Sequence, residues 1–211
     1  MSTDAKSLNQ QNNSSIITYI IVNILIFLIL DLGISVNTAM ESILEKLLTS
    51  APLLLVSSIF AQVINGQLSS NFKAILVFWR IKEPLPGCRA FSYFMDKDPR
   101  IDPNILKTKF GNLPSDPTEQ NRLWYKIYKK HESKTAVEDA HQKFLLTRDL
   151  AGFSFLFLVV MGFAAYFLLP NLHSWIIYTS VLILMFLINS MAARNYGIKF
   201  VNNVLAEESS V

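Results

Sequence analysis

The sequence predicts an all-α membrane protein, in which four transmembrane helices form two hairpins that flank a mainly helical cytoplasmic insert. Apolar residues make up 51% of the chain and charged residues only 17%, below the usual quarter or so. The apolar residues gather in four stretches that are long enough to cross about 30 Å of hydrocarbon. A charged segment with several helix-start motifs separates the second stretch from the third.

The four predicted spans are residues 15–36, 47–64, 150–169 and 174–193. The second stretch contains Pro52 and Gln62, so an interfacial or re-entrant segment is the alternative there. These spans divide the chain into five parts. They are a disordered tail at 1–14, a first hairpin at 15–66, the insert at 67–148, a second hairpin at 149–193 and a tail at 194–211.

The distribution of basic residues predicts the orientation in the membrane. Residues 67–148 contain fifteen Lys or Arg, whereas the connection at 170–173 contains none. Cytoplasmic loops carry the excess of Lys and Arg in membrane proteins. We therefore expect a multi-pass protein of the bacterial cytoplasmic (inner) membrane, with the insert and both termini in the cytoplasm.

Three motifs in the insert predict helix starts. Asp102 and Asp116 each precede a proline, and an Asp-Pro pair supplies a side-chain cap together with a first residue that needs no N–H partner. Glu119 completes a capping box after Asp116, and Thr135 with Glu138 forms another. The insert is therefore expected to contain at least three helices.

The last of these helices is predicted to continue into the membrane. No glycine or proline occurs from Thr135 until Gly152, and one glycine does not break a helix. One long helix, or two collinear helices, is thus expected from about 136 to 169. It could carry a structural change into the bilayer, although many membrane helices extend into water without such a role. The residues of this candidate coupling helix are Val137, His141, Phe144, Arg148 and Asp149.

The sequence contains no motif that predicts an enzyme, and we expect no metal and no cofactor. Glu138 and His141 form one Glu-x-x-His pair, but a metal site in a helical bundle needs a second pair to face it. The chain lacks a phosphate-binding loop, a dinucleotide-binding turn and a nucleophile elbow. Its single cysteine, Cys88, excludes an internal disulfide framework.

The sequence "DKDPRID" is a candidate ligand loop. Its charged residues could hold a divalent ion or a phosphate, but turn-forming Asp-Pro and an Arg–Asp pair explain them without a ligand, and this second explanation is favoured. The residues concerned are Asp96, Asp98, Arg100 and Asp102.

A cluster of basic and aromatic residues is a candidate surface for a partner or trigger. Such a cluster could contact nucleic acid through phosphate pairing and stacking, or anionic lipid headgroups through charge. The bias of basic residues toward the cytoplasm favours membrane lipid, and direct binding of nucleic acid stays open. The candidate residues are Arg122, Trp124, Lys126, Tyr128, Lys129, Lys130 and His141.

The layout resembles small multi-spanning membrane effectors of bacterial anti-phage defence, which accompany retron reverse transcriptases or are gated by nucleotide second messengers. The likeness lies in the four apolar runs, in "PGCRAFSYFMDKDPRID", and in "NRLWYKIYKKHESKTAVEDAHQKFLLTRD" leading into the third span. It implies a homo-oligomer that depolarises the membrane in abortive infection. Its release would depend on a soluble partner such as a reverse transcriptase–DNA complex or a nucleotide-signalling protein.

Two other functions fit the same layout. One is a membrane-anchoring subunit that recruits a soluble partner without forming a pore. The other is a small transporter, which the sequence favours least because the spans contain few polar groups, such as Asn23, Asp31, Ser154 and Asn189.

Overall fold

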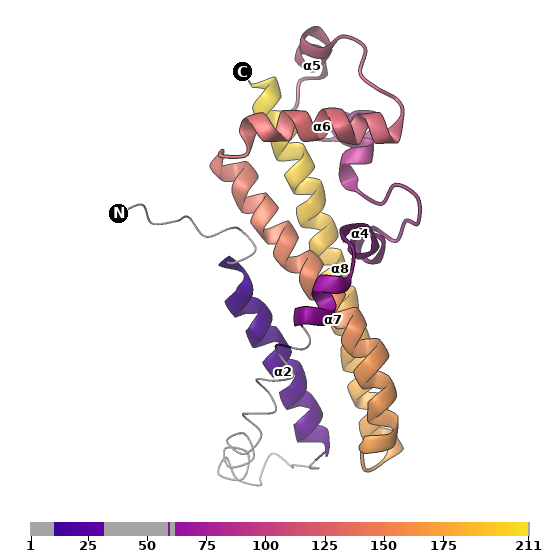
Figure 1. Cartoon of the computed structure of the whole chain (residues 1–211). Helices are drawn as coiled ribbons and strands as arrows, with labels where there is room; N and C mark the ends of the chain where they lie inside the picture. The colour runs from indigo at the N-terminus through magenta and orange to yellow at the C-terminus, as the bar shows by residue number, and fades with distance from the viewer. Residues whose placement is uncertain (1–10, 32–58, 60–61, 211) are drawn as a thin grey trace, which may run out of the picture. The chain divides into compact units, whose positions relative to one another are not determined.

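The computed structural model describes residues 11–31, 59 and 62–210, and every element in this part of the chain is a helix (Figure 1). This confirms the predicted all-α class for the described residues. The elements in order are α2 Asn13–Asp31, α4 Ser70–Phe78, η1 Pro86–Arg89, η2 Ala90–Phe94, η3 Met95–Lys97, α5 Pro103–Phe110, α6 Pro117–His131, α7 Thr135–Leu168 and α8 Leu172–Ser209.

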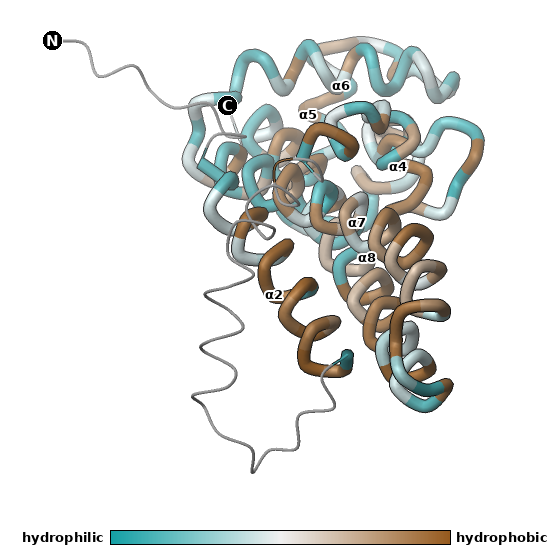
Figure 2. Tube along the Cα trace, turned by 60° about the horizontal axis from the view of Figure 1, so that its bottom comes forward, coloured by the Kyte–Doolittle hydropathy of each residue, from teal (hydrophilic) through white to brown (hydrophobic). Residues whose placement is uncertain are grey.

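Among the described residues, α2, α7 and α8 are long and apolar enough to cross a membrane. They correspond to the first, third and fourth predicted spans, and Figure 2 shows the hydrophobic colouring concentrated along them. The tail at 1–10 and most of the second predicted span lie outside the described residues. The structure therefore supports a membrane protein with three candidate spans.

The chain divides into two compact units, and α7 and α8 each contribute to both. The first unit, here called the apolar unit, contains α2 and residues 149–189. The second, here called the α6 module, contains residues 70–148 and 190–211. Each unit has its own buried residues and is described separately.

In the apolar unit, α7 and α8 form a hairpin through a tight turn. Asn171 precedes α8, and its side chain accepts a hydrogen bond from the Ser174 N–H at 2.8 Å, which caps the helix. The indole of Trp175 donates to the Gly162 carbonyl at 2.9 Å and packs edge-on against Tyr166. Large apolar side chains on the outside of the unit are exposed, as they are on helices that face lipid. They include Val159, Val160, Phe163, Phe167, Leu184 and Ile188.

The α6 module has an aromatic core centred on Phe200 of α8. The Phe200 ring lies 5.2 Å from Trp124, 5.1 Å from Tyr128 and 4.5 Å from His141, measured between ring centroids. These partners come from α6 and α7, so the core joins three helices. Burial of several aromatic side chains supplies most of the free energy that holds such a small module together.

Gly197 lets a second aromatic pair reach α8. Phe78 of α4 and Phe144 of α7 meet against this glycine. A β-carbon at position 197 would lie 2.8 Å from the Phe78 ring and 3.0 Å from the Phe144 ring, closer than packed atoms approach. The absence of a side chain is therefore what allows both rings to pack there.

The C-terminal segment differs from the tail expected at 194–211. Residues 194–209 continue α8, and the buried side chains of Val201, Val204 and Leu205 face the rest of the α6 module. The apolar residues 200, 201, 204 and 205 follow helical spacing. This run of apolar residues is too short to span a membrane. It forms the buried face of the C-terminal part of α8, which packs on the rest of the module.

Candidate functional site

The helices that carry the candidate residues begin where the Asp-Pro motifs predict. The carboxylate of Asp102 accepts from the Asn104 N–H at 2.8 Å, and that of Asp116 accepts from the Glu119 N–H at 3.0 Å. Each carboxylate satisfies an N–H that the first turn of a helix leaves without a partner. Both predicted caps are confirmed, and they position α5 and α6.

Gln120 of α6 fixes the chain that follows η1. Its side-chain oxygen accepts from the backbone N–H groups of Phe91 and Ser92, both at 3.1 Å, and its amide donates to the Ser115 carbonyl at 3.0 Å. The residue is fully buried. A buried polar side chain with this many partners specifies one arrangement of the backbone around it.

The candidate partner surface separates into two sets of residues. Trp124 is buried, and Tyr128 and His141 are half-buried in the aromatic core. An aromatic platform for stacking a nucleotide base is therefore not presented by Trp124. The exposed members of the set are the four cations Arg122, Lys126, Lys129 and Lys130.

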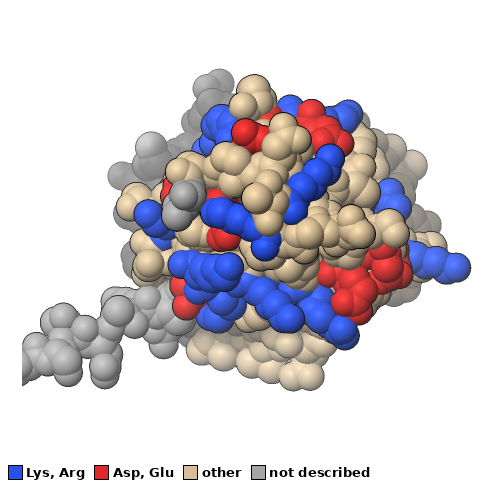
Figure 3. All heavy atoms as spheres, turned by 90° about the horizontal axis from the view of Figure 1, so that it is seen from above, with Lys and Arg blue, Asp and Glu red and all other residues tan. Residues whose placement is uncertain are grey.

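The exposed cations of α6 lie among acidic residues. Arg122 pairs with Glu119 at 2.8 Å, and Lys129 pairs with Glu132 at 2.5 Å. Figure 3 likewise shows Lys and Arg side chains interspersed with Asp and Glu on one face of the molecule. Exposed ion pairs of this kind contribute about 0–1 kcal/mol each, so these cations can exchange their partners at little cost.

His141 of the candidate coupling helix is part of the packing. Its ring stacks parallel to Phe200, and its Nδ1 lies 3.1 Å from the hydroxyl of Tyr128. Burial, and then the charge of Arg148, lowers the pKa of His141 to about 4. The imidazole is therefore neutral at pH 7 and fits an aromatic core.

The rest of the candidate coupling helix lies on one unbroken element. α7 is a single helix of 34 residues, as predicted. Val137 and Phe144 are buried, and the guanidinium of Arg148 lies 5.9 Å from the Phe144 ring centroid. Arg148 and Asp149 are half-buried and mark the point where the sequence of α7 becomes apolar.

The charged residues of the candidate ligand loop mostly bind one another. The guanidinium of Arg100 donates two hydrogen bonds to Asp98, at 2.7 and 2.9 Å, and these bonds lower the pKa of Asp98. Asp102 caps α5, while Asp96 is exposed. In the described part of the chain no group of three or more His, Cys, Asp and Glu could hold a metal ion.

Two hydrogen bonds through Asn203 connect this loop to α7. Arg100 also donates to the side-chain oxygen of Asn203 at 3.1 Å, and the amide of Asn203 donates to the Ala136 carbonyl at 2.7 Å. Asn203 thus links the loop to the first turn of α7. Asn203 is not among the residues predicted from the sequence, because nothing in the local sequence marks it.

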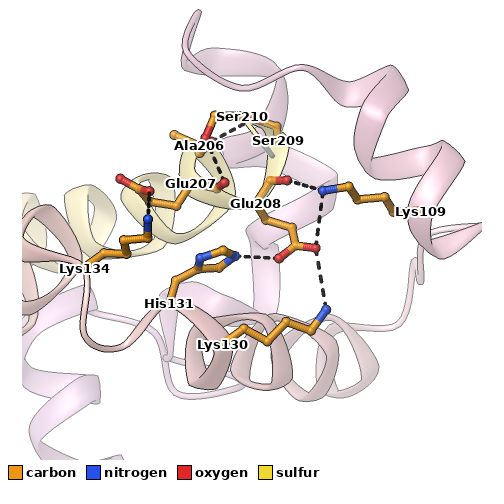
Figure 4. Close-up of polar contacts among 9 residues, drawn as sticks. All are labelled: Lys109, Lys130, His131, Lys134, Ala206, Glu207, Glu208, Ser209 and Ser210. Carbon is orange, nitrogen blue, oxygen red and sulfur yellow. Dashed lines mark hydrogen bonds and ion pairs between the residues drawn. The ribbon is translucent and has the colours of Figure 1, made fainter.

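A second site missed from the sequence is a buried carboxylate, Glu208, near the end of α8 (Figure 4). It is 6% exposed, and its Oε2 lies 2.6 Å from Nε2 of His131. Lys130 lies 3.6 Å from its Oε1, and Lys109 donates to its backbone carbonyl at 2.7 Å. The cluster ties α5, α6 and α8 together.

The charges around Glu208 determine its ionisation. Burial raises the pKa of this carboxyl, but the hydrogen bond with His131 and the charges of Lys130 and Lys109 outweigh that effect and lower it. Glu208 is therefore ionised at neutral pH. A carboxylate in the last turn of a helix opposes the helix dipole, and this was the one sequence feature that could have indicated partners for Glu208.

The apolar unit contains a polar cluster formed by one residue from each of the three long helices described there, α2, α7 and α8. The hydroxyl of Tyr19 on α2 lies 2.6 Å from that of Ser154 on α7. Asn189 of α8 donates to Ser154 at 2.9 Å and to Tyr19 at 3.1 Å. Ser154 itself donates to the Leu150 carbonyl at 2.7 Å. Every hydroxyl in the cluster is thus satisfied inside an apolar unit.

Comparison of this chain with protein-family models, with curated proteins and with solved structures found no match.

Proposed function

We propose that this chain is an effector of bacterial antiviral defence, located in the cytoplasmic (inner) membrane. Release by a partner or trigger lets it perturb or depolarise that membrane. In this proposal four spans form two hairpins, and the α6 module and both termini are cytoplasmic. Because four spans cannot enclose a wide path, several copies of the chain assemble around any pore.

The observation that carries this proposal is the continuity of α7. Val137 and Phe144 are buried in the α6 module, and Ser154 of the same helix belongs to the polar cluster of the apolar unit. A helix without a break moves as one body along its length. A partner that displaces the start of α7 therefore has a direct mechanical route to the spans.

The polar cluster has the properties of a contact that can open. Hydrogen bonds between membrane helices contribute about 0.6–2 kcal/mol each. The cluster of Tyr19, Ser154 and Asn189 therefore favours one arrangement of three helices without locking it. Binding of a partner to the module can supply free energy of this size.

The test is to uncouple the module from the spans by a kink in α7. Thr147→Pro removes a backbone hydrogen bond and kinks the helix just before its apolar stretch. Thr147→Ala removes only the side-chain hydrogen bonds from its hydroxyl to the Lys143 and Phe144 carbonyls and is the matched control. Each variant is overproduced in bacteria while a voltage-sensitive dye reports the membrane potential.

We expect the unmodified chain and Thr147→Ala to depolarise the cells and Thr147→Pro to leave their potential unchanged. Equal membrane levels of the three proteins, measured on blots, are the control for expression. Overproduction of the unmodified chain without loss of potential would contradict the effector proposal.

The second candidate function is a membrane anchor for a soluble partner, favoured by the exposed cations of α6. Arg122 and Lys126 are exposed there, which suits an acidic partner such as a reverse transcriptase–DNA complex or an acidic surface of a nucleotide-signalling protein. If the chain is only an anchor, its overproduction should leave the membrane potential of the cells unchanged. It also predicts co-purification of the partner that is lost in the double variant Arg122→Glu, Lys126→Glu.

A further inference from the structure

The α6 module contains a cavity whose charged lining consists of three arginines. The cavity has a volume of about 370 Å³ and is lined by Arg80, Arg89 and Arg194, with Phe78 and Ile198 among its apolar walls. Arg80 follows α4, Arg89 ends η1 and Arg194 lies on α8. Only the fold brings these three segments to one place. We call this cavity the arginine pocket.

The arginine pocket holds positive charge without a matching carboxylate. No Asp or Glu in the described residues forms an ion pair with any of the three arginines. Burial, and then the charge of Arg80, lowers the pKa of Arg89, and Arg194 acts in the same direction. Like charges brought close together repel each other, and a bound anion relieves that repulsion.

Donor groups in the pocket are positioned in advance. The Nε of Arg89 is buried and has no hydrogen-bond partner among the described residues. Arg194 is held by two hydrogen bonds to the Val77 carbonyl, at 3.1 and 3.3 Å, and its guanidinium lies 4.5 Å from the Trp79 ring. A guanidinium fixed in this way loses little further freedom on binding, which favours affinity for its ligand.

The chemistry of guanidinium groups selects the ligand. Their planar N–H donors match two oxygens of a phosphate, and arginine is the usual residue for recognising it. A cavity of this volume lies in the range of sites for small ligands. It has room for a phosphate together with a substituent of about the size of glycerol.

The sequence around the pocket adds features of a membrane interface. Arg194 directly follows the fourth predicted span on the same helix, α8. Beside Arg80, the side chains of Trp79 and Ile81 are 57% and 83% exposed. Exposed tryptophan and isoleucine next to basic residues are typical of segments that contact lipid headgroups.

We propose that Arg80, Arg89 and Arg194 bind a phosphate group, carried either by an anionic phospholipid headgroup or by a soluble phosphate. This site goes beyond the proposed effector function and does not depend on it. A chain that binds phosphate here without depolarising membranes would refute the effector proposal and leave this one intact.

The test measures binding to the full chain in an uncharged detergent by native mass spectrometry. The probes are short-chain phosphatidylglycerol, short-chain phosphatidylcholine and inorganic phosphate. Arg80→Gln removes one cation of the pocket at an exposed position, so the variant is expected to fold normally. Lys107→Gln removes the same charge from an exposed position of α5, outside every candidate surface, and is the matched control. Unfolding temperatures without ligand verify that both variants fold.

We expect phosphatidylglycerol to bind the unmodified chain and Lys107→Gln equally, and Arg80→Gln at least about tenfold more weakly, the size of one charged hydrogen bond. Competition by inorganic phosphate at millimolar concentration, with the same dependence on Arg80, supports the site and assigns it to soluble phosphate. Failure of phosphate to compete assigns it to lipid. Equal binding of the two lipids, equal losses in the two variants, or no binding of any probe would overturn the proposal.

Discussion

The apolar unit and the α6 module share α7 and α8 but expose opposite kinds of side chain. In the module, Phe200 is 4% exposed at the centre of the core, and most cations lie outside. In the apolar unit, Phe163 is 71% exposed, whereas Ser154 is buried in a hydrogen-bonded contact. The same pair of helices thus exposes apolar side chains along one part of its length and mostly charged ones along the other.

This difference in exposed side chains is explained by the solvent around each part of the helices, water around one part and lipid around the other. In water, burial of apolar surface drives packing, so aromatic side chains form the core. Lipid is as apolar as the side chains themselves, so that drive is absent between spans, and small or polar residues specify their contacts instead. Substitutions that are matched between the two units test this explanation.

The largest loss of stability is expected from a substitution at the centre of the module. Phe200→Ala removes the ring that Trp124, Tyr128 and His141 contact, and we expect it to lower the free energy of unfolding of the module by about 3–5 kcal/mol. Hydrogen exchange of the α6 amides in detergent measures this loss. Phe167→Ala, the same change at an exposed position of the apolar unit, is the control and should leave α6 protected. Equal effects would contradict the comparison.

The next largest effect is at the buried carboxylate of the module. Glu208→Gln removes a charged hydrogen-bond partner of His131 and is expected to lower stability at pH 7 by about 1.5–3 kcal/mol. Because the folded pKa of Glu208 lies below its ordinary value of 4.5, its stabilising contribution is complete above that pH. It is lost as pH falls through the folded pKa.

Unfolding temperatures between pH 7 and pH 3 measure this contribution. The difference between the unmodified chain and Glu208→Gln should be constant near neutral pH and should shrink below about pH 4.5. A difference that stays the same down to pH 3 would show that the charge of Glu208 is not what stabilises the module.

A smaller effect is expected in the apolar unit. Asn189→Leu removes the donor to Ser154 and Tyr19, and we expect a loss of about 1 kcal/mol in the association of the helices. A double-mutant cycle with Tyr19→Phe, read out by resistance to unfolding in denaturing detergent, isolates the coupling. Strictly additive losses would mean that these two side chains do not interact.

The smallest effect at neutral pH concerns His141. With a pKa of about 4 in the folded chain it is neutral at pH 7, so His141→Phe keeps the stacking on Phe200 and changes stability by no more than about 1 kcal/mol. An unfolded histidine has a pKa near 6.5, so acid favours unfolding between about pH 6.5 and 4.

The unmodified chain should therefore lose stability over this interval, and His141→Phe should lose less. Unfolding temperatures measured across the interval in one detergent provide the comparison. Identical slopes for the two proteins would mean that His141 is not the residue that titrates.

Local features of the sequence predicted much of the fold. The caps at Asp102 and Asp116 and the unbroken helix α7 were predicted because each depends on neighbouring residues along the chain. The apolar stretches predicted α2, α7 and α8 because their length and composition suffice for that inference. The prediction of the candidate partner surface was less accurate, because Trp124 is buried in the core and does not lie on the surface.

What the sequence alone determined is therefore the helical character of the described residues, the three candidate spans among them and the helix starts, because each of these arises within one stretch of chain. Only the tertiary structure decided that Gly197 admits two aromatic rings, that Glu208 meets His131, and that Arg80, Arg89 and Arg194 share a pocket. These contacts join residues far apart in the sequence. Such residues are brought together by the packing of whole helices, which local propensity does not determine.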